Sequence, residues 1–361
     1  MRRRCGWRCN TLPSASMEMD RDLLELLACP ECGSANLALL SDPDFIGVAC
    51  SSCASRYPIR NGIPQMLPAH LAATLDQKNA YKEKLRASII GHGDLPRPGN
   101  PEVDRFMWEH QLYDWAKEVI YSDSGAGEIF SSYAERGARG LCQFLRERVG
   151  PVDGKTLLYV GSGNDRLLSL ALEQEGAFIV NLDLVYDSLD DLRQAGARNC
   201  VCGDARYLPF RAGAIDVVFS KGSVHHCHPI AKPLWSMARV VKQGGHIIVA
   251  EPNKYMLLRL PTLLLPPKLT KALGASVKAL WPKGKKSGLG YPTPYEQAIS
   301  AREVMRILSK EGISQLQLAT MTHASPWTPA PVARLWERMG RGMPWLFHRF
   351  AFEFIVHGRK I

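Results

Sequence analysis

Two pairs of cysteines are the residues whose spacing most clearly suggests chemistry. Cys29 and Cys32 form one C-x2-C pair, and Cys50 and Cys53 form a second after seventeen intervening residues. Two such pairs on tight turns bring four thiolates to one tetrahedral ion, typically zinc. Four sulfur ligands leave no open coordination position, so we expect a structural site. With so small a core, metal binding is expected to supply most of the folding energy of this unit.

A glycine-containing turn is the second feature of interest. Gly161, Ser162 and Gly163 follow a short apolar run at 156–160, and a helical pattern begins at 166. Two glycines let the backbone turn sharply and approach a ligand closely. Alone this is weak evidence, because many α/β proteins have a glycine turn after a strand.

Two carboxylates follow the next apolar runs. Asp183 comes directly after 178–182, twenty residues beyond Gly163, where an acid can accept hydrogen bonds from ribose hydroxyls. Asp204 follows the run at 199–202 and is placed to reach an adenine amino group, with the backbone amide of Ala205 nearby. These positions indicate a site for an adenosine-containing ligand.

Alternating strands and helices are needed to bring these residues together. Strands are predicted at 156–160, 178–182, 199–202, 215–220 and 246–250, and helices at 133–149, 166–174, 187–194 and 230–241. A capping box at Ser300 opens a helix to about Lys310, and two last strands are predicted at 315–319 and 352–356. This alternation predicts βαβ units and a mainly parallel sheet.

Length and composition limit the class of protein. The chain has 361 residues, of which 46% are hydrophobic and 22% charged, which excludes bulk disorder and fits two or three globular domains. No apolar run reaches the roughly 18 residues of a membrane-spanning helix. Ten cysteines without a disulfide-framework spacing favour a reducing, cytoplasmic compartment.

Basic residues are concentrated in one stretch. The net charge is +10, and between Pro252 and Tyr295 there are eight lysines or arginines and no acid. Apolar groups with lysines behind them suit a helix at an anionic membrane surface, or a lid over a lipidic substrate. A solvated loop, or a lid that packs on its own domain, explains the same pattern.

The N-terminal cysteines lie in a stretch that resembles a known family. Leu27-Ala28-Cys29-Pro30 and Tyr57-Pro58-Ile59-Arg60-Asn61-Gly62-Ile63-Pro64 are similar to the small zinc-ribbon proteins that activate methyltransferases acting on tRNA, rRNA and release factors. The resemblance covers about fifty residues. It implies a zinc ribbon, which in such families is sometimes a separate subunit and sometimes fused.

The glycine turn and its partners together resemble class I S-adenosylmethionine-dependent methyltransferases. The resemblance is carried by 157–163, Asp183, 203–210 and 239–245, and it runs from about 130 to 255. It implies an α/β fold with a seven-stranded, doubly wound, Rossmann-like sheet and S-adenosylmethionine over the carboxyl ends of the first strands. In this fold the residues from Ser220 onward, after the fourth strand, line the methyl-transfer site.

The segment after that fourth strand supplies the candidate catalytic residues. His225 or His226 could act as a general base for O-methylation, a role needed only when the acceptor must lose a proton. The alternative is that both histidines pack at a helix entry and bond to backbone. An Asn-Pro-Pro-Tyr-like motif, frequent in enzymes that methylate base or glutamine amino groups, is absent here, which disfavours those acceptors.

Two positions depart from the family pattern. Tyr159 stands where the family usually has an acid, and Asp165 stands where it usually has a third glycine. The family's acid helps hold the amino group of the methionine part of the cofactor, and we expect Asp165 to replace it from the other side of the loop. The alternative is a domain that has lost its cofactor.

The chain is therefore predicted to contain a disordered leader at 1–19, a zinc ribbon at 20–68, a helical connector at 69–130, and the methyltransferase domain at 131–361 with a basic apolar insertion at 254–295. The expected activity is S-adenosylmethionine-dependent methyl transfer to a small, lipidic or glycan-linked acceptor, with peripheral contact to an anionic membrane. One alternative is an RNA methyltransferase that grips phosphates through its ribbon and lysines, although few aromatics interleave those lysines. The other is a non-catalytic adaptor.

Overall fold

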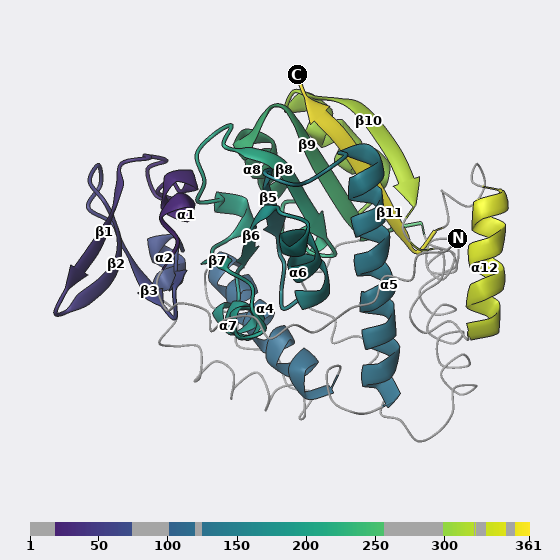
Figure 1. Ribbon diagram of the computed structural model, residues 1–361, viewed down its shortest axis with the longest axis horizontal. Helices are drawn as coiled ribbons and strands as arrows, with labels where there is room; N and C mark the ends of the chain where they lie inside the picture. Colours follow the sequence, from purple (N-terminus) through teal and green to yellow (C-terminus); the bar gives the residue numbers. More distant parts are fainter. Residues whose placement is uncertain are drawn as a thin grey trace.

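The computed structural model describes residues 19–73, 101–119, 125–255, 299–320, 322, 330–343 and 351–361 (Figure 1). The leader expected at 1–19 lies outside this part of the chain apart from Met19. The insertion expected at 254–295 lies outside it apart from Lys254 and Tyr255. Within the described residues, no helix is both long and apolar enough to cross a membrane.

A seven-stranded sheet forms the larger part of the protein, in the order β10-β11-β9-β8-β5-β6-β7. Its strands are β5 (Thr156–Val160), β6 (Phe178–Asp183), β7 (Asn199–Cys202), β8 (Ile215–Lys221), β9 (Val241–Pro252), β10 (Ile313–Thr320) and β11 (Glu353–Lys360). Neighbours from β7 to β9 are parallel, whereas β11 runs antiparallel to both β9 and β10. The predicted seven-stranded methyltransferase sheet is confirmed, and the bounds predicted for β5 and β7 are matched.

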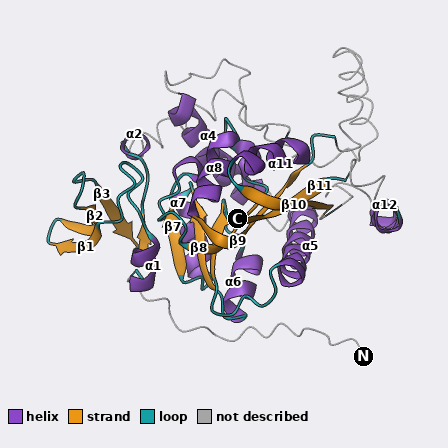
Figure 2. Ribbon diagram, turned by 90° about the horizontal axis from the view of Figure 1, so that it is seen from above, coloured by secondary structure: helices purple, strands orange, loops and turns teal. Residues whose placement is uncertain are grey.

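Helices cover both faces of this sheet (Figure 2). They are α5 (Gly125–Arg148), α6 (Arg166–Gln174), α7 (Tyr186–Gln194), α8 (Ala231–Val240) and α11 (Ala301–Lys310); α12 (Ala330–Gly342) follows β10. Side chains alternate across each strand. Leu157 and Tyr159 of β5 therefore pack in the core under α5 and α6, whereas Leu158 and Val160 pack in the core under α8 and α11.

The N-terminal unit is a small antiparallel sheet in the order β1-β2-β3-β4, which lies at the left of Figure 1. Its elements are α1 (Arg21–Leu26), β1 (Leu37–Asp42), β2 (Phe45–Cys50), β3 (Arg56–Arg60), β4 (Ile63–Pro64) and α2 (Ala69–Ala72). Asp20 caps α1 by accepting a 2.9 Å hydrogen bond from the Asp22 amide. The unit ends against β7 of the large sheet.

Backbone pairing joins the small unit to the large sheet. Met66 donates a 2.7 Å hydrogen bond to the Cys202 carbonyl at the end of β7, and the Ala28 amide donates a 3.0 Å bond to the Pro209 carbonyl. Leu27 forms an antiparallel bridge with Phe210, and both side chains are fully buried in one continuous core. The small unit thus holds the loop after β7 from outside.

A further helix, α4 (Pro101–Val119), closes the same edge from the other side. Phe106 and Met107 are buried with Leu67 and Leu71 of the small unit and with Leu189 of α7. α4 lies within the segment 69–130, for which the sequence predicted a helical connector. The loop after β7 consequently lies between α4 and the small unit.

Candidate active site

A cavity of about 830 Å³ opens at the carboxyl ends of β5, β6, β7 and β8. This is the position where parallel α/β sheets bind ligands. One part of its wall is formed by the glycine turn, and the remainder comes from the ends of β6, β7 and β8 and from α4, α5, α6 and α7. Its size lies within the usual range for small-molecule and cofactor sites.

The glycine turn needs both of its glycines. Gly161 has φ +67°, and an added Cβ would lie 2.2 Å from the Cβ of Ser223, so no side chain fits there. Gly163 has φ +53°, but no atom lies within 4 Å of its Cβ position. Since Gly161, Ser162 and Gly163 all line the cavity, the turn presents bare backbone to a ligand.

Asp183 holds the turn against the end of β6. One carboxylate oxygen accepts a 2.8 Å hydrogen bond from the Gly163 amide, and the other accepts a 2.8 Å bond from the Val185 amide. Burial raises the pKa of Asp183, and these two hydrogen bonds act in the opposite direction. A carboxylate has about four acceptor positions, so Asp183 keeps capacity for hydroxyl groups of a ligand in the cavity.

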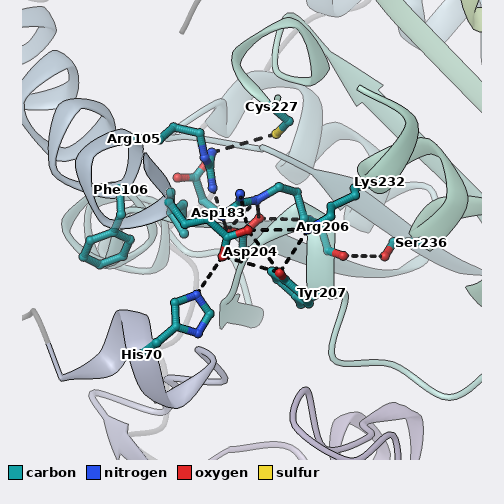
Figure 3. A network of polar contacts seen from close by, with 12 residues as sticks. His70, Arg105, Phe106, Asp183, Asp204, Arg206, Tyr207, Cys227, Lys232 and Ser236 are labelled. Atoms are coloured by element: carbon teal, nitrogen blue, oxygen red, sulfur yellow. Dashed lines mark hydrogen bonds and ion pairs between the residues drawn. The ribbon is translucent and has the colours of Figure 1, made fainter. Parts of the chain in front are cut away.

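Asp204 is bound by two arginines. Its carboxylate is fully buried, 2.6 Å from Nη2 of Arg105 in α4 and 2.7 Å from Nη2 of Arg206 in the 3-10 turn η2 (Ala205–Tyr207) (Figure 3). Burial alone would raise the pKa of Asp204, but the charges of Arg105 and Arg206 outweigh it and lower the pKa to about 2. The carboxylate also accepts the amide hydrogen of Arg206 at 2.9 Å. Protein donors therefore fill the acceptor positions of the Asp204 carboxylate. The predicted contact between this carboxylate and an adenine amino group did not anticipate those donors.

The two arginines extend this network into neighbouring elements (Figure 3). Arg206 lies 3.1 Å from Glu102 of α4, and Glu102 lies 2.8 Å from Nε2 of His70 in α2. The Tyr207 hydroxyl donates to Glu102 at 3.2 Å, and the Ser236 hydroxyl of α8 donates to the Arg206 carbonyl at 2.9 Å. Four elements are thereby tied to one carboxylate.

The two predicted histidines lie in different surroundings. Both belong to the 3-10 turn η3 (Val224–His226), but His226 lines the cavity and His225 does not. His225 is buried, with Nδ1 2.6 Å from Oε2 of Glu251, which is itself fully buried. The other oxygen of Glu251 accepts the amides of Ser223 and Val224. His225 therefore ties the turn to the Glu251 carboxylate.

His226 faces an acid that the sequence analysis did not identify. Its Nδ1 lies 3.4 Å from Oε1 of Glu109 in α4, and both residues line the cavity. Burial acts to raise the pKa of Glu109, but the charges of His226 and Arg105 outweigh it and the pKa is lowered. An ionised carboxylate beside an imidazole orients the ring and stabilises its protonated form.

The other predicted site residues also fall into two groups, those that line the cavity and those that do not. Asp165 and Ala205 line the cavity, as expected for cofactor contacts. Ser220 does not: its side chain is fully buried within β8, and its neighbour Lys221 lines the cavity instead. This corrects the expectation for Ser220, because successive side chains of a strand point to opposite faces, so that Lys221 and not Ser220 reaches the cavity.

Residues of α4 were missed because its apolar pattern dominated the sequence. Arg105 and Glu109 stand four residues apart and so share one face of the helix. This spacing indicates a shared helix face, but it does not indicate that this face borders the cavity. Lys221 belongs to the segment from Ser220 onward that was expected to line the methyl-transfer site, although its side chain was not singled out.

The four clustered cysteines lie together as predicted. The Sγ atoms of Cys29, Cys32, Cys50 and Cys53 are all within 4.8 Å of one another. The Cys29–Cys53 and Cys32–Cys50 sulfur distances are both 3.6 Å, and the Tyr57 hydroxyl is 2.9 Å from Sγ of Cys29. Among the described residues no other group of cysteines, histidines and acids converges in this way, so Cys200, Cys202, Cys227 and His228 do not form a second metal site.

Comparison with known proteins distinguishes the same two parts of the chain, the larger sheet and the four-cysteine unit. Residues 158–249 match a family model described as a methyltransferase domain. Over 136 residues the chain is 31% identical to the biotin biosynthesis bifunctional protein BioHC of Cellvibrio japonicus, covering 37% of this chain but only 27% of that protein. Over 49 residues it is 47% identical to a UPF0434 protein of Nitrosococcus oceani, covering 14% of this chain and 78% of that protein.

Among solved structures, the magnesium protoporphyrin IX methyltransferase of Synechocystis is similar, with a TM-score of 0.45, 14% identity and coverage of 73% of this chain and 100% of that one. The fold and the family match show that this protein contains a class I S-adenosylmethionine-dependent methyltransferase domain. Its N-terminal part, with the four-cysteine cluster, belongs to the UPF0434 family. S-adenosylmethionine is accordingly the methyl donor of the domain.

The Asp204 network leads to a prediction about stability. Asp204→Asn would leave the buried Arg105 guanidinium without its anion and Arg206 with Glu102 alone, and we expect it to lower the free energy of unfolding at pH 7 by about 3–5 kcal/mol. Because the folded pKa of about 2 lies below the ordinary value of 3.8, the Asp204 contribution is complete above about pH 4 and is lost toward pH 2. Urea unfolding of both proteins between pH 7 and pH 3 measures this.

The matched control is Asp42→Asn, which breaks an exposed ion pair with Arg56 at 3.5 Å. Exposed pairs contribute less than about 1 kcal/mol, so this variant should unfold like the unmodified protein. Equal effects of the two substitutions would contradict the argument.

Proposed function

We propose that this protein methylates an oxygen atom of a small acceptor, with donor and acceptor meeting in the cavity at the carboxyl ends of the strands. The observation that carries the proposal is the cavity wall itself. A bare glycine turn and Asp183 stand on one side, and a histidine–carboxylate pair stands on another.

The residues of the cavity fit S-adenosylmethionine. Gly163 leaves open space for a ligand close to the backbone, and Asp183 has acceptor capacity for two ribose hydroxyls. Since two arginines occupy the Asp204 carboxylate, we assign adenine recognition to the backbone of Ala205 and to Nε of Arg105. Among the residues that the structure describes, that buried nitrogen has no hydrogen-bond partner, and its side chain lines the cavity.

His226 is the proposed general base. When bound, S-adenosylmethionine supplies an electrophilic sulfonium methyl group to the acceptor oxygen. The Glu109 carboxylate lies 3.4 Å from Nδ1 of His226 and, in this proposal, attracts the ring hydrogen to that nitrogen, so that Nε2 carries the lone pair. His226 then takes the proton that the acceptor oxygen gives up, and the Glu109 charge stabilises the imidazolium.

The acceptor is proposed to be lipidic or glycan-linked. Two sequence features support this choice: the apolar and basic stretch at 254–295, and the absence of an amino-methylation motif in 220–228. The acceptor oxygen requires a base, whereas a neutral amine does not, and a histidine–carboxylate pair at the cavity wall supplies one.

The proposed cofactor site predicts a contrast between two glycines. Gly163→Ala places a methyl group in the cavity, and we expect S-adenosylhomocysteine affinity to fall at least tenfold in calorimetric titration. Gly150 has φ +81° and an equally open Cβ position, but it does not line the cavity. Gly150→Ala therefore carries the same backbone strain of about 1–2 kcal/mol and should bind normally. Equal binding by both variants would refute the cofactor site, as would an unmodified protein that binds no cofactor at millimolar concentration.

The proposed base predicts a loss of turnover without a loss of cofactor binding. His226→Gln should lower methyl transfer to a lipid extract by about 10²–10⁴-fold, and Glu109→Gln by a smaller factor, while S-adenosylhomocysteine affinity stays the same. Transfer is measured with a labelled methyl group. His228→Gln, an exposed histidine two residues away that does not line the cavity, is the matched control. Full activity of His226→Gln would exclude this base.

We also propose that the cysteine cluster binds structural zinc. A Zn–S distance of about 2.3 Å in a tetrahedron separates sulfurs by roughly 3.8 Å, and two of the sulfur pairs lie 3.6 Å apart. Cys29 and Cys50 are buried in the same core as Leu158 and Val160 of the large sheet. The metal is therefore expected to stabilise more than its own unit.

Metal analysis should find one zinc per chain. Removal by a chelator should lower the midpoint of thermal unfolding of the whole protein, since the two units share one core. Cys32→Ser should lose the metal, whereas Cys142→Ser, at a buried position of α5, should retain it. Metal-free protein with an unchanged midpoint would contradict the proposal.

A further inference from the structure

The outer edge of the small sheet is open. Strand β1 stands first in the order β1-β2-β3-β4, and among the described residues it pairs with β2 alone. The backbone groups of Ala38 to Ser41 that point away from β2 have no hydrogen-bond partner in the described part of the chain. Both views show β1 and β2 extending away from the large sheet (Figure 1 and Figure 2). This edge can therefore accept a further strand.

The other sheet edges are protected. Gln65, next to β4, forms a parallel bridge with Cys202 of β7, so one edge of the small sheet and one edge of the large sheet cover each other. At the other edge of the large sheet, β10 is irregular: Gln315 has φ +50°, and the pairing with β11 shifts between Ser314 and Gln317. Such irregularities disfavour pairing between edges.

Strand β1 has none of these protections. Its register with β2 is continuous from end to end, and it contains no lysine or proline, the residues that commonly block an edge. Leu39 opposes Val48, and Ser41 opposes Ile46, so these four side chains lie on one face of the sheet. On that face Leu39 is 42% exposed and Ile46 is 61% exposed. An open backbone edge thus coincides with exposed apolar side chains.

The sequence of β1 is complementary to an antiparallel copy of itself. Opposed residues of two paired strands share a face, so the two-fold axis of such a pair passes through a residue rather than between two residues. With the axis at Leu39, each Leu39 opposes its own copy, and Leu37 opposes Ser41 of the other copy. Residues 37–41 carry no charge, and Asp42 remains beyond the pair, where it keeps its ion pair with Arg56.

We propose that β1 pairs with β1 of a second copy of this chain, which joins two four-stranded sheets into one. The contact is isologous, and Leu39 lies at its centre between the two Val48 side chains. One short strand from each copy buries less surface than the roughly 1,200–2,000 Å² of stable interfaces, so the dimer is weak and depends on protein concentration. The pairing is independent of the proposed methyl transfer, because no residue of β1 lines the cavity.

Sedimentation velocity of the full, metal-loaded chain across the micromolar range tests the pairing. The sedimentation coefficient of the unmodified protein should rise with concentration. Leu39→Lys places two ammonium groups opposite each other at the axis and should weaken self-association at least about tenfold. Leu318→Lys is the matched control, because Leu318 is 40% exposed on the other edge strand, β10, and this variant should associate normally. Metal content equal to that of the unmodified protein shows that the small unit of Leu39→Lys is folded.

Cysteine substitutions test the register. Leu39→Cys should form a disulfide-linked dimer under mild oxidation, because each introduced thiol opposes its own copy. Leu40→Cys would oppose Ala38 on the other face and should cross-link no more than the unmodified protein. An unmodified protein that stays monomeric at every concentration overturns the proposal. Equal association of Leu39→Lys and Leu318→Lys, or equal cross-linking of the two cysteine variants, overturns it as well.

Discussion

The arrangement of the site depends on how one buried carboxylate is neutralised. Asp204 is fully buried, and a lone charge there would cost several kcal/mol. Arg105 arrives from α4 and Arg206 from the turn that follows Asp204, and Glu102 balances the second of these cations. Because Arg105 is anchored in this way, the same face of α4 is held over the cavity, and Glu109, one turn later, meets His226. An electrostatic requirement thereby positions the proposed acid–base pair.

The loop after β7, which begins at Asp204, is held on the side opposite α4 by apolar contacts and backbone pairing. Leu27 and Phe210 are buried together, and the Ala28 amide bonds the Pro209 carbonyl. The loop from Asp204 to Phe210 therefore has a fixed position only when both α4 and the N-terminal unit are in place. This gives the four-cysteine unit a structural link to the cofactor side of the cavity, although none of its residues lines the cavity.

Most of the fold could be predicted from local sequence patterns. The bounds of β5, β7, α6 and α11 follow from apolar runs, glycine turns and the Ser300 cap, each of which acts over a few residues. The cavity wall at Gly161, Gly163, Asp183 and Ala205 follows in the same way, because the carboxyl ends of parallel strands meet at one edge. Arg105 and Glu109 could not be placed, since they precede the glycine turn by some fifty residues and their contacts arise from long-range packing. The difference between His225 and His226 also required the partners Glu251 and Glu109, which lie far away in the sequence.

The two departures from the family pattern are explained together by charge. The Tyr159 hydroxyl donates to Asp165 across 3.1 Å, so an acid at position 159 would direct its charge toward Asp165. Two neighbouring carboxylates oppose each other's ionisation, because like charges raise the pKa values. Because Tyr159 is a hydrogen-bond donor rather than an acid, Asp165 carries the negative charge beside the glycine turn, and Lys221 balances that charge. A tyrosine in place of the acid and an acid in place of the glycine thus form one compensated set, in which the negative charge has moved from the strand to the helix cap. A carboxylate is thereby kept beside the glycine turn. The tyrosine alone would remove this carboxylate, and the aspartate alone would add a second one.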